Sequence, residues 1–324
     1  MTDETPLVSV VCTAYNHENY IKQALDGFVM QQCKFPIEVI VHDDASTDGT
    51  SAIINEYAAK HPFIRAILQT ENQYSKGFNI WEYLFTKEAK GKYIAICEGD
   101  DYWTDLLKLQ KQIDFLEANQ EYGLVYSKVT YFYQKKGKFS EAVGEDYKNF
   151  ENLLVTNVIP TLSVVIRKNL SIQYFLEIRP SEKNWILGDW PMWIWFAKNS
   201  KLFFIDTSIG VYRILAESTS HSLNPGKMEK FIKSCNGVPD FFINYYNVLD
   251  FKTVQEIKFN KIWGLFGIAC KFNIKHLFDE INKDIEEVRI KKNHVLFIKA
   301  VLCFRSLRFL FLFFKFSFNQ WKNR

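Results

Sequence analysis

The chain has 324 residues, of which 48% are apolar and 24% are charged, a composition typical of globular proteins and not of disordered or fibrous ones. This length is enough for one large domain with extensions or for two smaller domains. Nine of the 40 Lys and Arg residues lie between Arg289 and Arg324, where there is no Asp or Glu, so the first 288 residues carry 31 basic and 37 acidic groups. An acidic body with a basic, Phe-rich tail argues against a nucleic-acid-binding protein and favours a membrane surface as the tail's partner.

Six cysteines are spread along the chain without a Cys-x-x-Cys pair. Cys12 and Cys97 lie in apolar, strand-like runs, and we expect them to be buried, reduced thiols of a cytosolic protein. The first six residues, Met1–Pro6, contain neither the basic region nor the apolar region of a secretion signal, so none is predicted.

Strands and helices are predicted to alternate over the first 120 residues. Nearly continuous apolar runs predict buried strands at Leu7–Thr13, Ile37–Val41, Arg65–Leu68 and Lys92–Cys97. Helical spacing predicts helices at Glu18–Gln31, 46–60, Gly77–Lys90 and Leu106–Asn119, with Asn16 as the N-cap of the first. This alternation, with short connections, predicts a Rossmann-like α/β fold with a mostly parallel sheet and right-handed crossovers.

The pattern changes after residue 120. Strand-like segments separated by polar stretches occupy residues 124–165, and an aromatic helix is expected at Gly188–Lys198, followed by strands at Leu202–Ile205 and Val211–Arg213. Beyond Glu229 the apolar spacing is helical to the end of the chain. We therefore expect one α/β domain over residues 1–225 and a helical C-terminal extension over residues 226–324.

Asp43 and Asp44 follow the second predicted strand. In open parallel sheets ligands bind beyond the carboxyl ends of the strands, and carboxylates there can accept hydrogen bonds from a nucleotide's base or ribose. The same residues are also typical of a helix N-terminus, and Asp48 is expected to cap the following helix in either case. No Gly-x-Gly-x-x-Gly motif follows the first strand, which argues against a dinucleotide site.

A second acidic cluster, Glu98-Gly-Asp100-Asp101, follows the fourth predicted strand. Carboxylates crowded on one tight turn repel each other unless a cation joins them, and their oxygens suit Mg²⁺ or Mn²⁺. Gly99 allows the backbone to turn sharply. The alternative is an exposed acidic turn before a helix.

A third acidic candidate, Asp189, is surrounded in sequence by tryptophans at positions 185, 190, 193 and 195. In an apolar cleft its proton affinity would rise toward that of a useful general base. The alternative is an N-cap, with Pro191 in the first turn of a short helix.

Five motifs occur in a fixed order: Pro6–Asn16, Asp43–Thr50, Glu98–Trp103, Gly188–Pro191 and Val211–Arg213. Together they closely resemble the motifs of family 2 glycosyltransferases with the GT-A fold. The resemblance extends over about residues 5–220 and does not include the last hundred residues.

The resemblance implies a site for a nucleotide-sugar donor, usually a uridine diphosphate sugar. It assigns nucleotide binding to Thr13, Ala14, Tyr15, Asn16, Asp43, Asp44 and Asp100. Asp100 occupies the second place of the family's Asp-x-Asp motif and is therefore the expected ligand of Mn²⁺ or Mg²⁺ on the diphosphate. The first place is Glu98, so Glu98 or Asp101 is expected to contact the donor sugar or ribose.

The resemblance also implies an inverting reaction in which Asp189 is the catalytic base. Arg213 either holds the departing phosphates or forms an internal salt bridge. Relatives often carry a metal-binding His two positions after the Tyr-Arg pair. Here that position is Leu215, and His221 is a weak substitute.

The tail, His294–Phe318, is apolar but interrupted by basic residues, and its longest uncharged stretch, Phe309–Phe314, is too short to span a bilayer. As a helix it would place its basic residues along one side, as in helices that lie on anionic lipid. The alternative is a helix that docks on the protein or forms a homo-oligomer contact. Lipid binding would place the protein in the cytoplasm, peripherally on the inner face of the cell membrane.

Taken together, the sequence predicts transfer of a sugar to a glycan or lipid-linked glycan in cell-surface polysaccharide or lipopolysaccharide synthesis. Two other classes remain open. A nucleotidyltransferase on a related fold would need a Gly-rich phosphate loop after the first strand, and Ala14–His17 does not supply one. A catalytically silent binding or scaffold protein would not need Asp44, Asp100 and Asp189 together.

Overall fold

A computed structural model of the chain describes residues 5–215 and 222–303. The described residues form two compact units. The first comprises residues 5–150, 158–184 and 188–215, and the second comprises residues 151–157, 185–187 and 222–303. Each unit is described by itself below.

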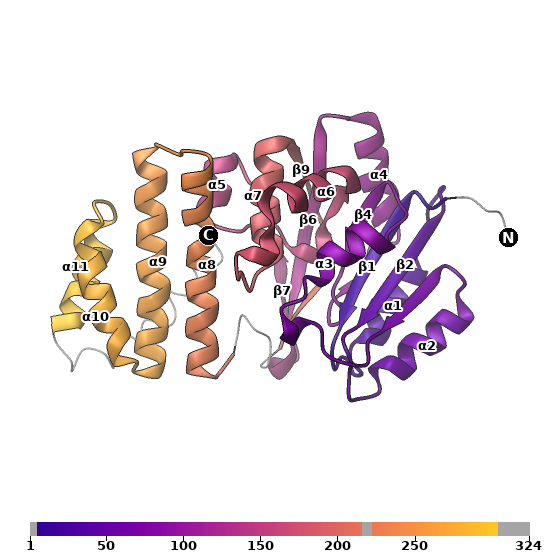
Figure 1. The fold of residues 1–324 in the computed structure, drawn as a ribbon, viewed down its shortest axis with the longest axis horizontal. Helices are drawn as coiled ribbons and strands as arrows, with labels where there is room; N and C mark the ends of the chain where they lie inside the picture. The colour runs from indigo at the N-terminus through magenta and orange to yellow at the C-terminus, as the bar shows by residue number, and fades with distance from the viewer. Residues whose placement is uncertain (1–4, 216–221, 304–324) are drawn as a thin grey trace. The chain divides into compact units, whose positions relative to one another are not determined.

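The first unit is built on one sheet whose strands run side by side with helices against it (Figure 1). The strand order is β3 (Ile64–Leu68), β2 (Ile37–Asp43), β1 (Val8–Ala14), β4 (Tyr93–Ile96), β8 (Val165–Arg167), β6 (Tyr122–Tyr133), β9 (Lys201–Ile214) and β5 (Tyr102–Trp103), with β7 (Lys138–Val143) paired to β6. The first four strands in this order are parallel, whereas β8, β5 and β7 pair antiparallel with their neighbours. The predicted α/β fold is confirmed, and the sheet is parallel in its first half and mixed in its second.

The helices of this unit are α1 (Ile21–Val29), α2 (Thr50–Lys60), α3 (Ile80–Tyr83), α4 (Lys108–Ala118), α6 (Lys168–Ile178) and α7 (Asp189–Asn199). A further helix, α5 (Phe150–Val155), crosses from the first unit into the second. The central strands β1, β4 and β8 are mostly apolar and almost wholly buried, so the core lies between the sheet and these helices. Cys12 and Cys97 belong to this core as free thiols, as predicted.

Three predicted regions differ from the structure. The strand-like pattern predicted over residues 124–165 is interrupted by the helix α5. The helix predicted at Gly77–Lys90 begins only at Ile80, because Gly77 has a left-handed backbone and the Asn79 side chain caps the N–H of Glu82. It then continues as a π-helical turn over Leu84–Glu88. The two strands predicted near residues 202–213 are one long strand, β9.

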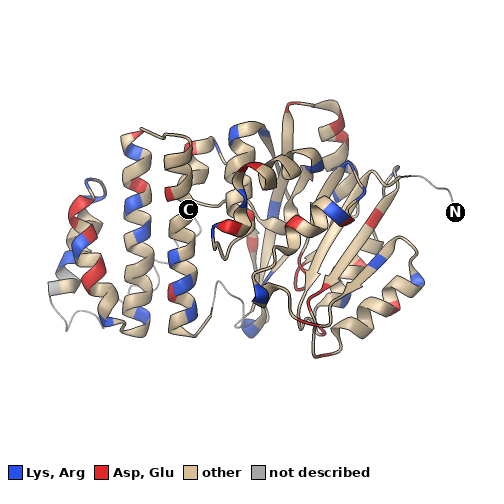
Figure 2. Cartoon of the chain, in the orientation of Figure 1, with Lys and Arg blue, Asp and Glu red and all other residues tan. Residues whose placement is uncertain are grey.

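The second unit is helical, as predicted for the C-terminal region. Its main helices are α8 (Pro225–Tyr245), α9 (Phe251–Phe272), α10 (Lys275–Asp284) and α11 (Lys292–Cys303), and α8 to α10 stand beside one another (Figure 1). Asn224 and Asp250 cap α8 and α9 with their side chains. The charged residues of α9 are mostly basic, whereas α10 carries both signs (Figure 2). Within the described ranges, no helix has the length and apolar character needed to cross a membrane. Most of the predicted interfacial tail, from residue 304 onward, lies outside them.

Candidate active site

Three of the predicted site segments meet at the carboxyl edge of the parallel strands. The carbonyl oxygen of Ala14, at the end of β1, accepts a hydrogen bond of 2.9 Å from the backbone N–H of Asp44, just after β2. The carbonyl oxygen of Thr13 accepts one of 2.9 Å from the N–H of Gly99, just after β4. The parallel register of β1, β2 and β4 therefore brings these segments together.

Gly99 lies close to side chains of β1 and α1. A Cβ atom at this position would lie 2.8 Å from Cδ1 of Ile21, 3.0 Å from Nδ1 of His17 and 3.1 Å from Cβ of Ala14. A larger residue would therefore require these side chains to shift, and glycine lets the acidic turn pack closely without such a shift.

Asn16 joins the turn after β1 to the turn after β2, and the prediction that it caps the first helix is wrong. Its backbone N–H donates to Oγ of Ser46 at 2.8 Å, and its Oδ1 accepts from the N–H of Thr47 at 2.8 Å. Asn16 has a positive φ of 56°, and α1 begins later, at Ile21. The neighbouring Tyr15 ring is 47% exposed beside this turn, so it is accessible to a ligand.

Asp43 and Asp44 are both buried, and both carboxylates have partners within the chain. Asp43 accepts hydrogen bonds from the hydroxyls of Ser46 and Ser51. Asp44 accepts from the backbone N–H groups of Gln73 at 2.7 Å and Tyr74 at 3.0 Å. The Asp44 carboxylate thus holds the loop that follows β3, a role for which the sequence carried no signal.

Asp48, and not Asp43 or Asp44, accepts a backbone hydrogen bond at the start of α2. The N-cap position is Gly49, and the Asp48 carboxylate accepts from the N–H of Thr50 at 3.0 Å. Partial burial raises the pKa of Asp48, but hydrogen bonds from Thr50 outweigh that effect and the net pKa is lowered. The pair at 43–44 is therefore not explained by capping.

Glu98, Asp100 and Asp101 form an acidic turn in which the pKa values of Glu98 and Asp101 are raised. Burial, followed by the charges of Asp100 and Asp189, raises the pKa of Glu98 to about 8. Burial and the same cluster raise the pKa of Asp101 well above its ordinary value, although Arg213 opposes the shift. The Asp101 carboxylate is fixed by the backbone N–H of Arg213 at 2.7 Å.

Asp189 lies at the start of α7 and shares this electrostatic environment, since its charge contributes to the raised pKa of Glu98. Its Oδ2 accepts from Oγ1 of Thr161 at 3.0 Å, and its Oδ1 accepts from the N–H of Trp190 at 2.7 Å. The N-cap position is Gly188, so Asp189 is the first residue of the helix. Trp190, Pro191, Trp193 and Trp195 are buried around this turn.

Arg213 joins three chain segments. Its Nε donates to the carbonyl of Asp100 at 2.7 Å, and its terminal nitrogens donate to Oε1 of Gln134 at 2.9 Å and Oε1 of Gln23 at 2.5 Å. The guanidinium also lies 4.8 Å from the ring centroid of Tyr20. Arg213 is 5% exposed. Its side-chain contacts are internal, as the second alternative expects, but the acceptors are a backbone carbonyl and two side-chain amides and not a carboxylate. Gln23, Gln134 and Thr161 had no signal in the sequence.

The acidic turn carries carboxylate oxygens, the type of ligand that Mg²⁺ and Mn²⁺ prefer. In the described part of the chain, no three side chains of His, Cys, Asp or Glu gather as a self-sufficient metal site. Mg²⁺ and Mn²⁺ are commonly held by one or two carboxylates together with phosphate oxygens, and the raised pKa of Glu98 beside Asp100 marks a place where positive charge is favoured. Leu215 is buried, and His221 lies outside the described residues.

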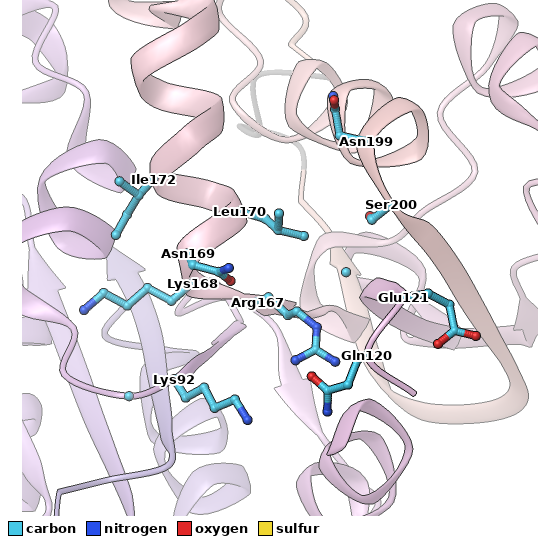
Figure 3. Close-up of a pocket in the computed structure, with 12 residues that line it drawn as sticks. Lys92, Gln120, Glu121, Arg167, Lys168, Asn169, Leu170, Ile172, Asn199 and Ser200 are labelled. Atoms are coloured by element: carbon cyan, nitrogen blue, oxygen red, sulfur yellow. The ribbon is translucent and has the colours of Figure 1, made fainter. Parts of the chain in front are cut away.

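A wide cavity of the first unit lies at the opposite edge of the sheet. It measures about 760 Å³ and borders the residues just before β4, β6 and β9. Its cationic side chains already have partners: Arg167 donates to Oη of Tyr93 and to two carbonyls near the end of α4, and Lys92 pairs with Glu117 at 2.9 Å. Figure 3 shows the Arg167 guanidinium beside the Gln120 side chain. Size alone therefore does not identify the site.

The fold is an α/β sheet whose carboxyl edge carries a cluster of acidic residues. The sequence matches the model of "Glycosyl transferase family 2" over residues 9–171, and the chain belongs to this family. The predicted family and the predicted GT-A fold are confirmed.

Relatives and solved structures agree with this assignment. The chain is 38% identical to Mycobacterium tuberculosis Rv1520, an uncharacterized protein, over 66% of this chain and 61% of that relative, so it spans about three-fifths of the relative's length. It is 29% identical to an Escherichia coli protein, "UDP-Glc:alpha-D-GlcNAc-diphosphoundecaprenol beta-1,3-glucosyltransferase WfaP", over 86% of this chain and 98% of WfaP.

Two solved structures share the fold. Residues 1–349 of S. aureus TarS in complex with UDP-GlcNAc have a TM-score of 0.51 at 17% identity, and the match covers 84% of this chain and 83% of that TarS fragment. The Pyrobaculum calidifontis mannosyltransferase PcManGT, with GDP-Man and Mn²⁺, has a TM-score of 0.53 at 15% identity, over 93% of this chain and 86% of PcManGT. At these identities the likeness concerns the fold alone.

Proposed function

We propose that the protein transfers a sugar, with inversion, from a UDP-sugar to a hydroxyl group of a glycan or lipid-linked glycan in surface-polysaccharide synthesis. The proposal rests on one observation. Asp44 and the acidic turn, which includes Asp100, lie at the same edge of the sheet, and the charge of Asp189 raises the pKa of Glu98 in that turn. The name of WfaP supports a UDP-linked donor and a lipid-linked acceptor, and the ligand of TarS supports the same nucleotide. PcManGT, with GDP-Man, is a reason to test guanosine donors too.

In this proposal the nucleotide lies along Thr13–Asn16 and Asp43–Asp44, with the exposed Tyr15 ring available to the base. Because the Asp44 carboxylate holds the loop after β3, nucleotide contact at Asp44 either uses its remaining lone pairs or displaces that loop. Asp100, with Glu98 beside it, would hold Mn²⁺ or Mg²⁺, which supplies positive charge for the departing diphosphate.

Asp189 is the proposed general base. One of its carboxylate oxygens takes the proton of the acceptor hydroxyl as that oxygen bonds to the anomeric carbon and the bond to the diphosphate oxygen breaks. A single displacement inverts the anomeric configuration and needs no enzyme nucleophile. Thr161 orients the carboxylate through its hydrogen bond to Oδ2.

Arg213 and Asp101 are proposed as positioning residues. The backbone of Arg213 fixes the Asp101 carboxylate, and the side chain of Arg213 fixes the carbonyl of Asp100. Both contacts set the shape of the turn from which Asp100 and Glu98 project. To contact a phosphate, the Arg213 guanidinium would have to break hydrogen bonds to acceptors within the chain.

We further propose that residues 1–225 are the catalytic domain and that residues 226–324 serve the acceptor, with the basic tail on the anionic inner face of the membrane. The charge imbalance of residues 289–324 supports this. Sedimentation with vesicles tests it: full-length protein should bind phosphatidylglycerol vesicles and not phosphatidylcholine vesicles, and binding should weaken at high salt. Equal binding to both, or none, would remove the membrane role.

The experiment for the activity is a donor screen. Purified protein with Mn²⁺ is incubated with individual UDP- and GDP-sugars, and release of the nucleoside diphosphate is followed for wild type and Asp100→Ala. Metal-dependent release from one donor, reduced at least about a hundredfold in the variant, is the expected result. Asp114→Ala on the exposed face of α4 is the matched control and should retain full activity. Failure to bind or hydrolyse any donor would favour the silent scaffold.

A further inference from the structure

A basic hairpin tip follows β6. The chain makes a 3₁₀ turn over Gln134–Lys136 and returns as β7, with Gly137 between them in the left-handed region at a φ of 58°. Three of the four residues 135–138 are lysines, and no Asp or Glu occurs from residue 122 to residue 140. We call residues 134–138 the basic tip. It concentrates positive charge in a part of the chain, residues 1–288, that carries an excess of acidic groups.

The direction of β6 places the basic tip at the carboxyl edge of the sheet. Strand β8 is antiparallel to both β4 and β6, so β6 runs in the same direction as β4, which is itself parallel to β1. The basic tip follows the end of β6, as the acidic turn follows the end of β4. Both therefore lie at the same edge of the sheet.

Hydrogen bonds join the basic tip to the acidic turn. Oε1 of Gln134 accepts from a terminal nitrogen of Arg213 at 2.9 Å, and Nε of the same guanidinium donates to the carbonyl of Asp100 at 2.7 Å. The strand register agrees with this contact, since Phe132 of β6 pairs with Arg213 of β9. A single guanidinium group therefore bridges the basic tip and the residue that is proposed to hold the metal.

The lysines of the basic tip are accessible and have no carboxylate partner. Lys135, Lys136 and Lys138 are all exposed, and none of them forms an ion pair within residues 5–215 and 222–303. Lys128, which lies on β6 in the same hairpin, is instead paired with Asp206. Because the charges of the tip are not matched within this part of the chain, they are available to an anion from solution.

An acceptor that carries phosphate groups would meet charges of both signs at this edge. Its hydroxyl must reach Asp189, whose surroundings include the carboxylates of the acidic turn, so its own negative charge is repelled there. The basic tip is joined to that turn and offsets the repulsion. Each lysine contacts phosphate as a point charge on a flexible four-carbon stem, so three of them can follow a mobile group with several negative charges.

We propose that the basic tip binds the phosphate or diphosphate group that links the acceptor sugar to its lipid. This assignment rests on the proposed function, from which it takes the lipid-linked acceptor, and it adds the residues that recognise the charge of that acceptor. An acceptor with the linking phosphates should then bind more tightly than a neutral glycoside of the same sugar.

Two probes that differ only in the linking group test this assignment: octyl N-acetylglucosaminyl diphosphate and octyl N-acetylglucosaminide. Each is titrated calorimetrically into the full chain, with the donor site filled by UDP and Mg²⁺. The diphosphate probe should bind about tenfold more tightly, and this preference should shrink as NaCl rises from about 0.05 to 0.5 M, because exposed charges are screened. Equal affinities for the two probes would overturn the assignment.

A variant with all three lysines of the tip changed to glutamine (Lys135→Gln, Lys136→Gln and Lys138→Gln) shows whether the tip is responsible. It should lose the preference for the diphosphate probe and should bind the neutral probe as wild type does. The matched control changes three other exposed lysines, which also have no ion pair among the described residues, to glutamine (Lys34, Lys87 and Lys90). The control removes the same net charge and should keep the preference. A preference that survives in the tip variant, or that the control loses equally, would overturn the assignment.

Titration of the same proteins with UDP and Mg²⁺ separates this result from the proposed transfer activity. If wild type does not bind UDP, the proposed function fails, whereas the two probes still report on the basic tip. A weaker affinity for UDP in the tip variant would assign the lysines to the donor and overturn their acceptor role. If the tip variant keeps its preference between the probes but loses binding to phosphatidylglycerol vesicles, the tip is a membrane contact, and the acceptor role is likewise overturned.

Discussion

The charged groups at the two edges of the central sheet differ in whether partners within the chain already compensate their charge. At the amino edge, a wide cavity is bordered by Arg167 and Lys92, whose charges are already matched by carbonyls or a carboxylate. At the carboxyl edge, Glu98, Asp100 and Asp101 crowd together, and the pKa values of Glu98 and Asp101 are raised. The two edges therefore differ in electrostatic demand: the charges at the amino edge have partners, whereas the acidic turn at the carboxyl edge favours protons or cations.

The largest expected effect is on the rate of sugar transfer, and it distinguishes Asp189, the proposed base, from the other residues of the carboxyl edge. Asp189→Asn should lower the rate of sugar transfer about a thousandfold, because an amide cannot accept the proton of the acceptor hydroxyl. Donor binding, measured by calorimetry with the UDP-sugar and Mn²⁺, should change little. Loss of donor binding together with transfer would show that Asp189 holds the donor, and unchanged transfer would exclude it as the base.

A smaller effect, on stability, tests the crowding of carboxylates. The pKa of Glu98 is raised from 4.5 to about 8 in the folded chain, so its protonated form stabilises the fold. That contribution is complete below pH 4.5 and is lost as pH rises toward 8. Urea unfolding should therefore show wild type losing stability between pH 5 and 8.5, with the loss reduced in Glu98→Gln by about 1–3 kcal/mol after allowance for partial exposure.

Glu117 at the amino edge provides the matched control for this pH dependence. Its pKa is lowered, chiefly by its hydrogen bond from Lys92, so it stays ionised above pH 5. Glu117→Gln should leave the slope between pH 5 and 8.5 as in wild type. Equal slopes in all three proteins would mean that Glu98 is not protonated preferentially in the folded state.

The smallest effect belongs to the amino edge. Lys92→Met removes an exposed ion pair with Glu117 and should change the free energy of unfolding by less than about 1 kcal/mol. Transfer activity should be unchanged. A large loss of activity without loss of stability would give the wide cavity a role in the reaction and would break the contrast between the two edges.

The strand ends and their acidic residues were predictable, because buried parallel strands leave a clear apolar signal and the register then brings Asp44 and Gly99 to β1. The ends of elements that depend on single side-chain contacts were not predictable from the sequence. Asn16 has the composition of an N-cap, yet it bonds to Thr47, a partner thirty-one positions away that local sequence does not reveal.

Roles that depend on distant partners were likewise beyond the sequence. Arg213 was left between two alternatives because Gln23 and Gln134 carry no pattern that marks them as its acceptors. Lys108 lies in the helix predicted at Leu106–Asn119, and the sequence does not reveal that its amine is buried against Trp103. The passage of residues 151–157 and 185–187 into the second unit also left no compositional mark.

The position of β9 has a consequence for how the protein is made. This strand is inserted between β6 and β5, and its Arg213 reaches back to Gln23, 190 positions earlier, and to Asp100. During synthesis the acidic turn therefore emerges from the ribosome long before the residue that shapes it, and closure of the sheet waits for a contact of very high sequence separation. A nascent or truncated chain that ends before β9 would lack both Arg213 and a complete sheet. We expect such a chain to have no glycosyltransferase activity.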